Sequence, residues 1–512
     1  MPICWYGDQD QLSRNQPYQL SHAGGAIASL LLEVDRRAAQ PLHEQIFDAV
    51  RARILSGELT PGLRLPSSRQ IAGDLGLART TVLQAFDALA AEGYIVTHAA
   101  SSTRVAPELP TEPEVRAPRP ASSRTAPRLS AVARALARLP SGTPRLGAAP
   151  RAFRPGTPAL DRFPSALWTR LSGRCHARAS SALLDGGDPI GHPALRSAIA
   201  AHVSASRGVR CDAAQVFVTA GTQPAFDEIL RLLVDPGDAV WVEDPGYLGA
   251  RRAVLGARAR PIAVPVDAHG LDVVAGMARA ARARAVVLAP SHQYPLGVMM
   301  SLARRLALLQ WAATTRAVVI EDDYDSEFRH RGRPLTALYG LDTANRVIYV
   351  GTFSKSLFPG LRLGFFVAPP PLVDAFAAGR ASLPTPASAL EQATLAAFIA
   401  EDHFASHLRR MRVLYRERGE ALRDALAADC GGALVALPCD TGMQLVARLG
   451  ISVTDRAFAS EAARLGVELG VLSSYAVSRR RPSGIVLGFG GVPAAAIRAG
   501  TRMLARVIER LA

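Results

Sequence analysis

Five short apolar runs, each followed by glycine, proline, aspartate or serine, constrain the fold of this chain most strongly. They are VFVTAG, AVWVEDPG, AVVLAPS, AVVIEDDYD and RVIYVGTFSK, and helical stretches separate them. Runs that are apolar on both faces and alternate with helices predict a buried, mostly parallel sheet. Ligands bind beyond the carboxyl ends of the strands in such sheets, so the polar residues after each run are candidate site residues.

The region after these runs completes the expected body. Beyond residue 370, long helices are followed by strands such as MQLVARL and GIVLGFG, which predicts a smaller α+β lobe. We therefore expect an α/β large domain over residues 155–370 and a C-terminal small domain over residues 371–512. The 512 residues leave room for a further domain, since domains hold about 100 to 200 residues.

Residues 30–106 predict that further domain, which is mostly helical and ends in a small hairpin. The apolar residues Ile46, Val50 and Ile54 recur at helical spacing. The expected elements are a helix between Pro41 and Gly57, a short helix capped by Ser67 or Ser68, a helix over residues 79–91, and strands over residues 94–97 and 103–105. Three helices followed by a hairpin are typical of a winged helix-turn-helix.

Two segments lack such patterns. Residues 1–29 show no sustained periodicity, and we expect a disordered extension or a start codon placed too early. Residues 107–154 are rich in Pro, Ala, Ser and Arg and predict a linker. From residue 106 to 154 there are nine arginines against three glutamates, whereas residues 36–105 hold eight arginines against six acidic residues. DNA contacts of the helical domain must therefore come from a few placed arginines, with a salt-sensitive contribution from the linker.

Composition excludes several classes of protein. No run of about 18 uncharged apolar residues is present, which excludes an integral membrane protein. The N-terminus lacks the basic start and apolar stretch of a signal peptide, so we expect a cytoplasmic location. The five cysteines are scattered without a CxxC pair, so we expect neither disulfides nor a metal site. A net charge of +15 permits a polyanionic partner.

Lys355 is the single lysine among 59 basic residues. Arginine keeps its charge under all usable conditions, whereas a lysine amine can deprotonate and attack a carbonyl. Chance survival of one lysine in an arginine-rich chain is the plainer explanation, and composition alone leaves it open. The neighbours favour chemistry, because Lys355 follows a predicted strand and Thr352, Ser354 and Arg362 suit a phosphate anion.

Other strand ends supply residues that suit an aromatic aldehyde cofactor. Asp322 can hold a pyridinium nitrogen protonated, and Tyr324 can donate to a ring phenolate. Tyr247, in EDPGY, can stack on the ring. Backbone amides at a predicted helix N-terminus can bind the same phosphate, and they belong to Gly221, Thr222 and Gln223.

Several nearby residues have plainer explanations. Asp323, Asp325 and Glu327 are expected to form a solvated acidic turn. His292, in SHQYPLG, is left unassigned. Met411 and Tyr415 recur at helical spacing and are expected in the core.

The stretch from PLHEQI to AAEGYI resembles the GntR family of bacterial DNA-binding regulators over about 65 residues. The resemblance implies that the starts of two helices face DNA, with Arg69 and Arg79 as the foremost contacts. The residues assigned to DNA on this basis are Ser67, Ser68, Arg69, Arg79, Thr80 and Thr81. The family's wing usually carries a Gly-Ser-Gly tip, whereas Ala100 and Ser102 stand in the glycine places here, so we assign no wing residue to DNA.

The motifs AGTQ, EDPGY, EDDYD and GTFSKSLFPGLRLGF together resemble the fold-type-I pyridoxal-phosphate enzymes, specifically the class I aminotransferases, over residues 150–510. A GntR-type reader joined to such a body resembles the MocR-type regulators. That resemblance implies the cofactor pyridoxal 5'-phosphate, operator DNA and a small amine or amino acid as effector, and a homodimer. It also implies that the effector is sensed by aldimine exchange at Lys355 and alters transcription.

The alternatives are a working aminotransferase with an accessory DNA-binding domain, and a GntR regulator whose ligand domain is inactive. The second would not need Lys355, Asp322, Tyr324 and Arg362 together. Aminotransferases of this class bind the substrate carboxylate with an arginine in a strand of the form xRLxF, whereas Val486 stands at that position here. The run Ser478 to Arg481 could supply a substitute. The missing arginine favours sensing over efficient transamination.

Overall fold

The computed structural model describes residues 30, 32–98, 102–109, 128–140, 152–330, 332, 336–380, 387–478 and 482–511. The chain divides into two units, Met1–Ala126 and Pro127–Ala512, and each is described by itself. The predicted extension 1–29, the wing residue Ala100, most of the predicted linker and residues 479–481 lie outside the described residues.

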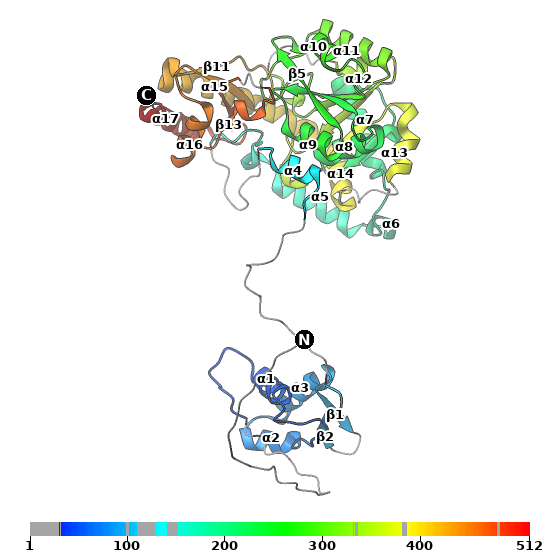
Figure 1. Cartoon of the computed structure of the whole chain (residues 1–512), viewed down its shortest axis with the longest axis vertical. Helices are drawn as coiled ribbons and strands as arrows, with labels where there is room; N and C mark the ends of the chain where they lie inside the picture. Colours follow the sequence, from blue (N-terminus) through cyan, green and yellow to red (C-terminus); the bar gives the residue numbers. More distant parts are fainter. Residues whose placement is uncertain are drawn as a thin grey trace, which may run out of the picture. The chain divides into compact units, whose positions relative to one another are not determined.

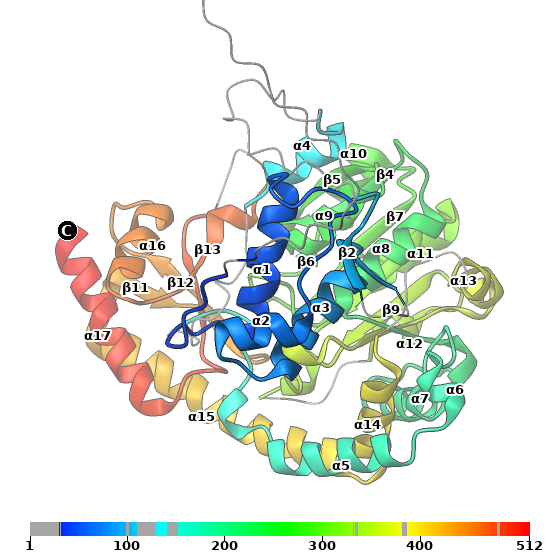
Figure 2. The same cartoon turned by 90° about the horizontal axis from the view of Figure 1, so that it is seen from below.

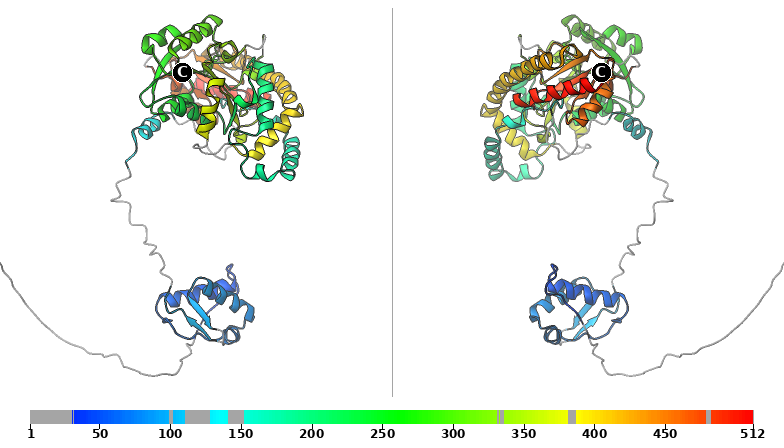
Figure 3. Two further views of the ribbon diagram at one scale, coloured as in Figure 1. Left: turned by 90° about the vertical axis from the view of Figure 1, so that its right-hand side faces the viewer. Right: turned by 90° about the vertical axis from the view of Figure 1, so that its left-hand side faces the viewer.

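The first unit is the predicted winged helix-turn-helix (Figure 3). Its elements are α1 (Leu42–Leu55), α2 (Ser68–Leu75), α3 (Arg79–Ala91), β1 (Ile95–His98) and β2 (Ser102–Val105). Ser67 caps α2, because its hydroxyl accepts a hydrogen bond from the Gln70 amide, and Gly76 ends the helix with a φ of +64°. The two strands form an antiparallel hairpin. The buried faces of the three helices meet in one apolar core around Ile46, Val50 and Phe86.

The second unit is built on an eight-stranded, mostly parallel sheet, as predicted (Figure 1). The strand order is β3-β10-β9-β8-β7-β4-β5-β6. The strands are β3 (Val216–Thr219), β4 (Ala239–Asp244), β5 (Arg260–Asp267), β6 (Gly270–Leu271), β7 (Ala285–Leu288), β8 (Val318–Asp323), β9 (Val347–Thr352) and β10 (Gly364–Val367). Only β6 and β10 run antiparallel to their neighbours among these strands. The carboxyl ends of β3, β4, β7, β8 and β9 therefore lie at one edge.

Helices cover both faces of this sheet. One face packs on α8 (Thr222–Leu233), α9 (Leu248–Gly256) and α13 (Val373–Arg380). The other packs partly on α10 (Val273–Ala280), α11 (Leu302–Thr315) and α12 (Leu338–Leu341), with the Trp241 and Trp311 rings stacked at 3.9 Å. The rest of that face packs on α5 (Ser165–Ala177), α7 (Pro193–Arg207) and α14 (Ala389–Ala400), near the short α6 (Ser181–Leu184).

The C-terminal lobe has the predicted α+β composition. Its four-stranded antiparallel sheet has the order β11-β12-β14-β13. The elements are α15 (His403–Cys430), β11 (Leu434–Ala436), β12 (Gln444–Leu449), α16 (Asp455–Arg464), β13 (Gly470–Val471), the short 3-10 helix η7 (Leu472–Tyr475), β14 (Ile485–Gly488) and α17 (Ala494–Leu511). The long helices α15 and α17 lie side by side (Figure 2). Met411 and Tyr415 are buried, which confirms their predicted place in the core.

Part of the range predicted as linker has structure in the second unit. Residues Ala131–Ala137 form α4, which packs on α9. Phe153 is fully buried and pairs with Gly488 of β14.

Candidate functional site

One cavity of about 460 Å³ in the second unit lies beyond the carboxyl ends of β3, β4, β8 and β9. All ten residues that the sequence assigns to the cofactor line it: Gly221, Thr222, Gln223, Tyr247, Asp322, Tyr324, Thr352, Ser354, Lys355 and Arg362. The parallel sheet brings together motifs that are more than 100 residues apart in the chain. The individual roles of these residues remain predictions.

Lys355 reaches the cavity from the turn that follows β9. Its Nζ donates a hydrogen bond of 2.7 Å to the carbonyl oxygen of Gly156. Gly156 has a φ of +69°, a conformation that favours glycine, and a Cβ atom there would lie 2.6 Å from that Nζ, so any other residue would displace the amine. Burial lowers the pKa of the Lys355 amine, while Asp325 and Asp322 raise it. The lowered pKa favours the neutral, nucleophilic amine.

Asp322, near the end of β8, is the carboxylate that faces this lysine. Its Oδ1 atom is buried and has no hydrogen-bond partner among the described residues. Burial, together with Asp323 and Asp325, raises the pKa of Asp322 to about 8, while Lys355 lowers it. An unpaired buried carboxylate costs free energy, so this position suits a cationic or hydrogen-bond-donating ligand atom.

The acidic stretch after Asp322 is not the solvated turn that the sequence predicts. Asp323 is buried and accepts hydrogen bonds of 2.7 Å from both Arg207 Nε and the Tyr349 hydroxyl. Asp325 is only 2% exposed. Glu327 is partly buried between His202 and Arg412. The prediction was wrong because each carboxylate has a partner from a segment distant in sequence.

Tyr324 and His292 belong to one hydrogen-bonded group. His292 Nδ1 lies 2.8 Å from Asp325 Oδ1 and 3.0 Å from the Tyr324 hydroxyl, and the rings of His292 and Tyr324 stack. When Nδ1 carries the proton and donates it to Asp325, the Tyr324 hydroxyl keeps its own hydrogen for the cavity. This arrangement assigns His292, which the sequence left open, to the orientation of Tyr324.

The cavity also offers hydrogen-bond donors for an anion. Gly221 precedes α8 with a φ of +107°, a conformation that favours glycine, and the first amides of a helix have no acceptor within the helix. The side chains of Thr352, Ser354 and the exposed Arg362 line the same cavity. These groups suit a phosphate.

Three polar side chains that line the cavity, those of Tyr294, Gln444 and Asp325, are not among the residues that the sequence assigns to the cofactor. Tyr294 donates a hydrogen bond of 2.8 Å to the Tyr475 hydroxyl and packs edge-on against Tyr247. Gln444, at the start of β12, is 4% exposed, and neither its Nε2 nor its Oε1 has a hydrogen-bond partner among the described residues. The Asp325 carboxylate also lines the cavity. Tyr294 lies in the SHQYPLG loop, the only signal that could have indicated it.

Val486 does not line this cavity. It lies on β14, pairs with Val446 and Gly470, and is fully buried in a small apolar cluster with Leu472. An apolar side chain here cannot bind a carboxylate.

The first unit presents the predicted DNA-binding residues at the starts of α2 and α3. Arg69, Arg79, Thr80 and Ser67 are exposed, whereas Ser68 and Thr81 are half-buried. The Ser68 hydroxyl accepts a hydrogen bond of 3.3 Å from Arg79 Nε, which links the two helix starts. Ser102 pairs with His98 at the end of the hairpin.

Comparisons with known families agree with this geometry. Residues 42–105 match the family described as bacterial regulatory proteins, gntR family, and residues 158–479 match aminotransferase class I and II. The chain is 42% identical over 483 residues to the probable rhizopine catabolism regulatory protein MocR of Rhizobium meliloti, covering 93% of this chain and 95% of that protein. It is 31% identical to the pyridoxine biosynthesis transcriptional regulator PdxR of Corynebacterium glutamicum, covering 91% of this chain and 95% of that protein.

Solved aminotransferases share the fold of the body. A kynurenine aminotransferase of Pyrococcus horikoshii matches with a TM-score of 0.66 and 25% identity, covering 75% of this chain and 96% of that chain. The α-aminoadipate aminotransferase LysN of Thermus thermophilus, solved with N-(5'-phosphopyridoxyl)-L-leucine, matches with a TM-score of 0.65 and 26% identity, covering 75% and 95%.

A winged helix-turn-helix of the GntR type followed by a fold-type-I aminotransferase body defines a class of DNA-binding transcriptional regulators that depend on pyridoxal phosphate. The chain belongs to the MocR-type regulators of that class. The residues present fit the cofactor: Asp322 has a buried oxygen without a partner, and the amine of Lys355 lies in the same cavity as the donors at the start of α8. Among the described residues, no helix is long and apolar enough to cross a membrane.

Proposed function

We propose that this regulator senses a small amine or amino acid through Lys355 and the cofactor, and that binding changes its action on operator DNA. When bound, pyridoxal phosphate supplies an aldehyde that bonds covalently to a primary amine. The observation that carries the proposal is that one cavity holds both the partly buried amine of Lys355 and the buried Asp322 Oδ1, which has no hydrogen-bond partner among the described residues.

Four groups would hold the cofactor from different sides. Asp322 would bind the ring nitrogen and keep it protonated, and Tyr324, oriented by His292, would donate to the ring oxygen. The amides of Gly221, Thr222 and Gln223, with Arg362, would bind the phosphate. Tyr247 would contact the ring face.

The effector would meet a neutral amide instead of an arginine. Val486 is buried away from the cavity, whereas the Gln444 side chain lines it and has a free donor and a free acceptor. A neutral amide holds a carboxylate less firmly than a bidentate guanidinium does. Loose positioning lowers reaction rates steeply, so effector binding should outrun turnover.

A homodimer acting in the cytoplasm is part of the proposal. Tyr247 lines the cavity yet is 39% exposed, which leaves its outer side open to a second chain. A dimer would carry two winged units, which suits an operator with two half-sites.

Titration of the cofactor-loaded protein with amino acids, ω-amino acids and polyamines tests this function. We expect one class to shift the absorption spectrum, with little keto acid formed over many minutes. Gln444→Leu should lower the affinity for that ligand by about tenfold, because a buried hydrogen bond to a charged group is lost. The control Gln310→Leu, on the exposed side of α11, should leave affinity unchanged. No spectral response to any amine would contradict the proposal.

A further inference from the structure

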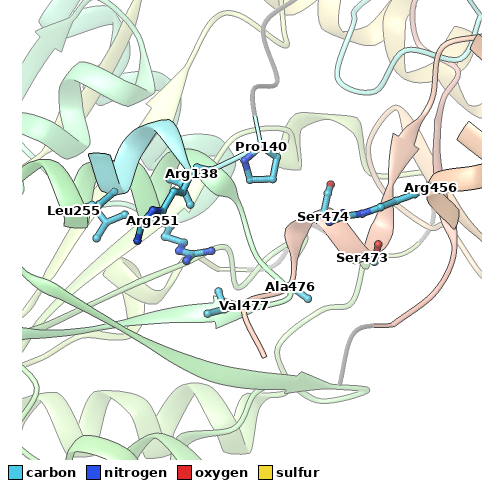
Figure 4. A pocket seen from close by; sticks show the side chains of 11 residues that line it. Arg138, Pro140, Arg251, Leu255, Arg456, Ser473, Ser474, Ala476 and Val477 are labelled. Atoms are coloured by element: carbon cyan, nitrogen blue, oxygen red, sulfur yellow. The ribbon is translucent and has the colours of Figure 1, made fainter. Parts of the chain in front are cut away.

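A second cavity, of about 360 Å³, lies in the second unit between α4, α9 and the segment around η7 (Figure 4). It shares no lining residue with the cofactor cavity. α4 contributes Arg138 at its C-cap, α9 contributes Arg251, and α16 contributes Arg456. Three guanidinium groups from three helices thus surround one open space.

The guanidinium groups of these arginines have no hydrogen bond or ion pair to another residue that the structure describes. The Nε atom of Arg251 is buried and lacks an acceptor. Burial lowers the pKa of the Arg251 guanidinium, while Asp244 raises it. Arg251 is half-buried, and a buried N–H group without an acceptor costs free energy, so an anion that accepts this hydrogen would stabilise the site.

Two carboxylates, Asp244 and Asp455, accept hydrogen bonds from residues of the cavity wall. Asp244 accepts hydrogen bonds from the amides of Val477 and Ser478, at 2.7 and 3.1 Å. Asp455 accepts from the amide and the hydroxyl of Ser473, both at 2.7 Å. Both carboxylates therefore shape the wall of the cavity and leave the guanidinium donors unused.

We propose that this cavity binds a small anion that carries phosphate or carboxylate groups. The planar guanidinium fork matches both groups with paired, charge-assisted hydrogen bonds. An anion bridging Arg138 to Arg251 and Arg456 would hold α4 against the body. Because α4 lies within the range predicted as linker, an anion bound here would fix this part of the range on the body.

Hydrogen exchange of residues 131–137 tests this site. The protein is first loaded with pyridoxal phosphate and reduced with borohydride, which fills the cofactor's own phosphate site. Inorganic phosphate and citrate are then titrated separately, and either should slow exchange of α4 with a midpoint at or below about 10 mM. If borohydride does not fix the cofactor, that result contradicts only the proposed covalent role of Lys355. The anion titration can then be repeated on unreduced protein that is saturated with cofactor.

Substitutions of the arginines test whether the anion protects α4 by binding in this cavity. Arg251→Gln and Arg138→Gln should each weaken protection of α4 by about tenfold, through the loss of charge-assisted hydrogen bonds. Arg138 is exposed, so its substitution leaves the core intact. The matched control Arg170→Gln, exposed on α5, should behave as wild type. No protection by either anion, or protection unchanged in both Arg251→Gln and Arg138→Gln, would overturn the proposal.

Discussion

The cofactor cavity and the DNA-binding face place their charged residues in opposite environments. In the cavity, Asp322 is 7% exposed and its pKa is raised to about 8. On the winged unit, Arg69 and Arg79 are exposed at the starts of α2 and α3. Removing the partner of a buried charge costs several kcal/mol, because the charge is left without water or a counter-charge. An exposed charge is solvated by water, so losing its partner costs little. Single substitutions should therefore act strongly in the cavity and moderately on the DNA face.

The largest effect should come from Lys355→Arg. The substitution keeps the positive charge but removes the amine that can bond to the cofactor's aldehyde. Loaded wild-type protein should be yellow, and borohydride should fix the cofactor to the peptide containing residue 355, whereas the variant should show neither. Absorption spectra and peptide mass spectrometry measure both results. A fixed cofactor on another peptide, or on none in the wild type, would refute the role of Lys355.

The neighbouring carboxylates Asp322 and Asp323 should respond differently to loss of charge. Asp322→Asn should weaken cofactor affinity by roughly 100-fold, since a buried ionic partner is removed from the ligand. Asp323→Asn should instead destabilise the fold by about 3 to 5 kcal/mol, because Arg207 loses its buried partner. Equilibrium dialysis and denaturant unfolding separate the two. Equal effects of both substitutions on cofactor affinity would contradict this distinction.

On the DNA face, Arg79→Ala should cost about 1 to 3 kcal/mol of operator affinity if it reads a base. The loss should be confined to the cognate sequence. Arg69→Ala should weaken binding to all DNA sequences. It should also reduce the slope of log affinity against log salt concentration by about 1, as expected for the loss of a phosphate contact. Arg53→Ala, whose arginine pairs with Glu58, serves as the control. Unchanged affinity in both variants at fixed salt would argue against the assignment.

The smallest effect should be a pH dependence of the cofactor-free protein. Burial raises the pKa of Asp322 from 3.8 to about 8, so the folded state binds this proton more tightly than the unfolded state. The stability from this group is complete below about pH 4 and is lost as pH rises through about 8. Wild-type Tm should therefore fall relative to that of Asp322→Asn between about pH 4 and 8. A constant difference would show that Asp322 does not titrate in this range.

Sequence alone predicted the elements and the cavity residues that follow strands. The sheet places the carboxyl ends of β3, β8 and β9 at one edge, so the convergence of Gly221, Asp322 and Lys355 could be predicted without knowledge of side-chain contacts. The partners of Asp323 and Asp325 could not be predicted in this way. Arg207 reaches Asp323 from the end of α7, which carries no strand-end signal. His292 does follow the run AVVLAPS, but the sequence does not show that Asp325 is its partner.

The second cavity, between α4, α9 and the segment around η7, could not be predicted from the sequence either. Arg138 lies in a segment whose composition is typical of a linker, and Arg251 and Arg456 resemble the other solvated arginines of an arginine-rich chain. Only the packing of α4 on α9 brings these guanidinium groups together.

Operator binding by wild-type and Lys355→Arg proteins, with and without the amine that shifts the spectrum, tests the central claim most directly. Fluorescence anisotropy with DNA from the promoter beside the gene provides the measurement. We predict equal affinity of the two proteins without effector, and a change of at least about fivefold on effector addition in the wild type alone, since only differential binding to two states transmits a signal. Rapid multiple turnover with a 2-oxo acid acceptor and no effect of either substrate on DNA binding would contradict the account and favour an aminotransferase.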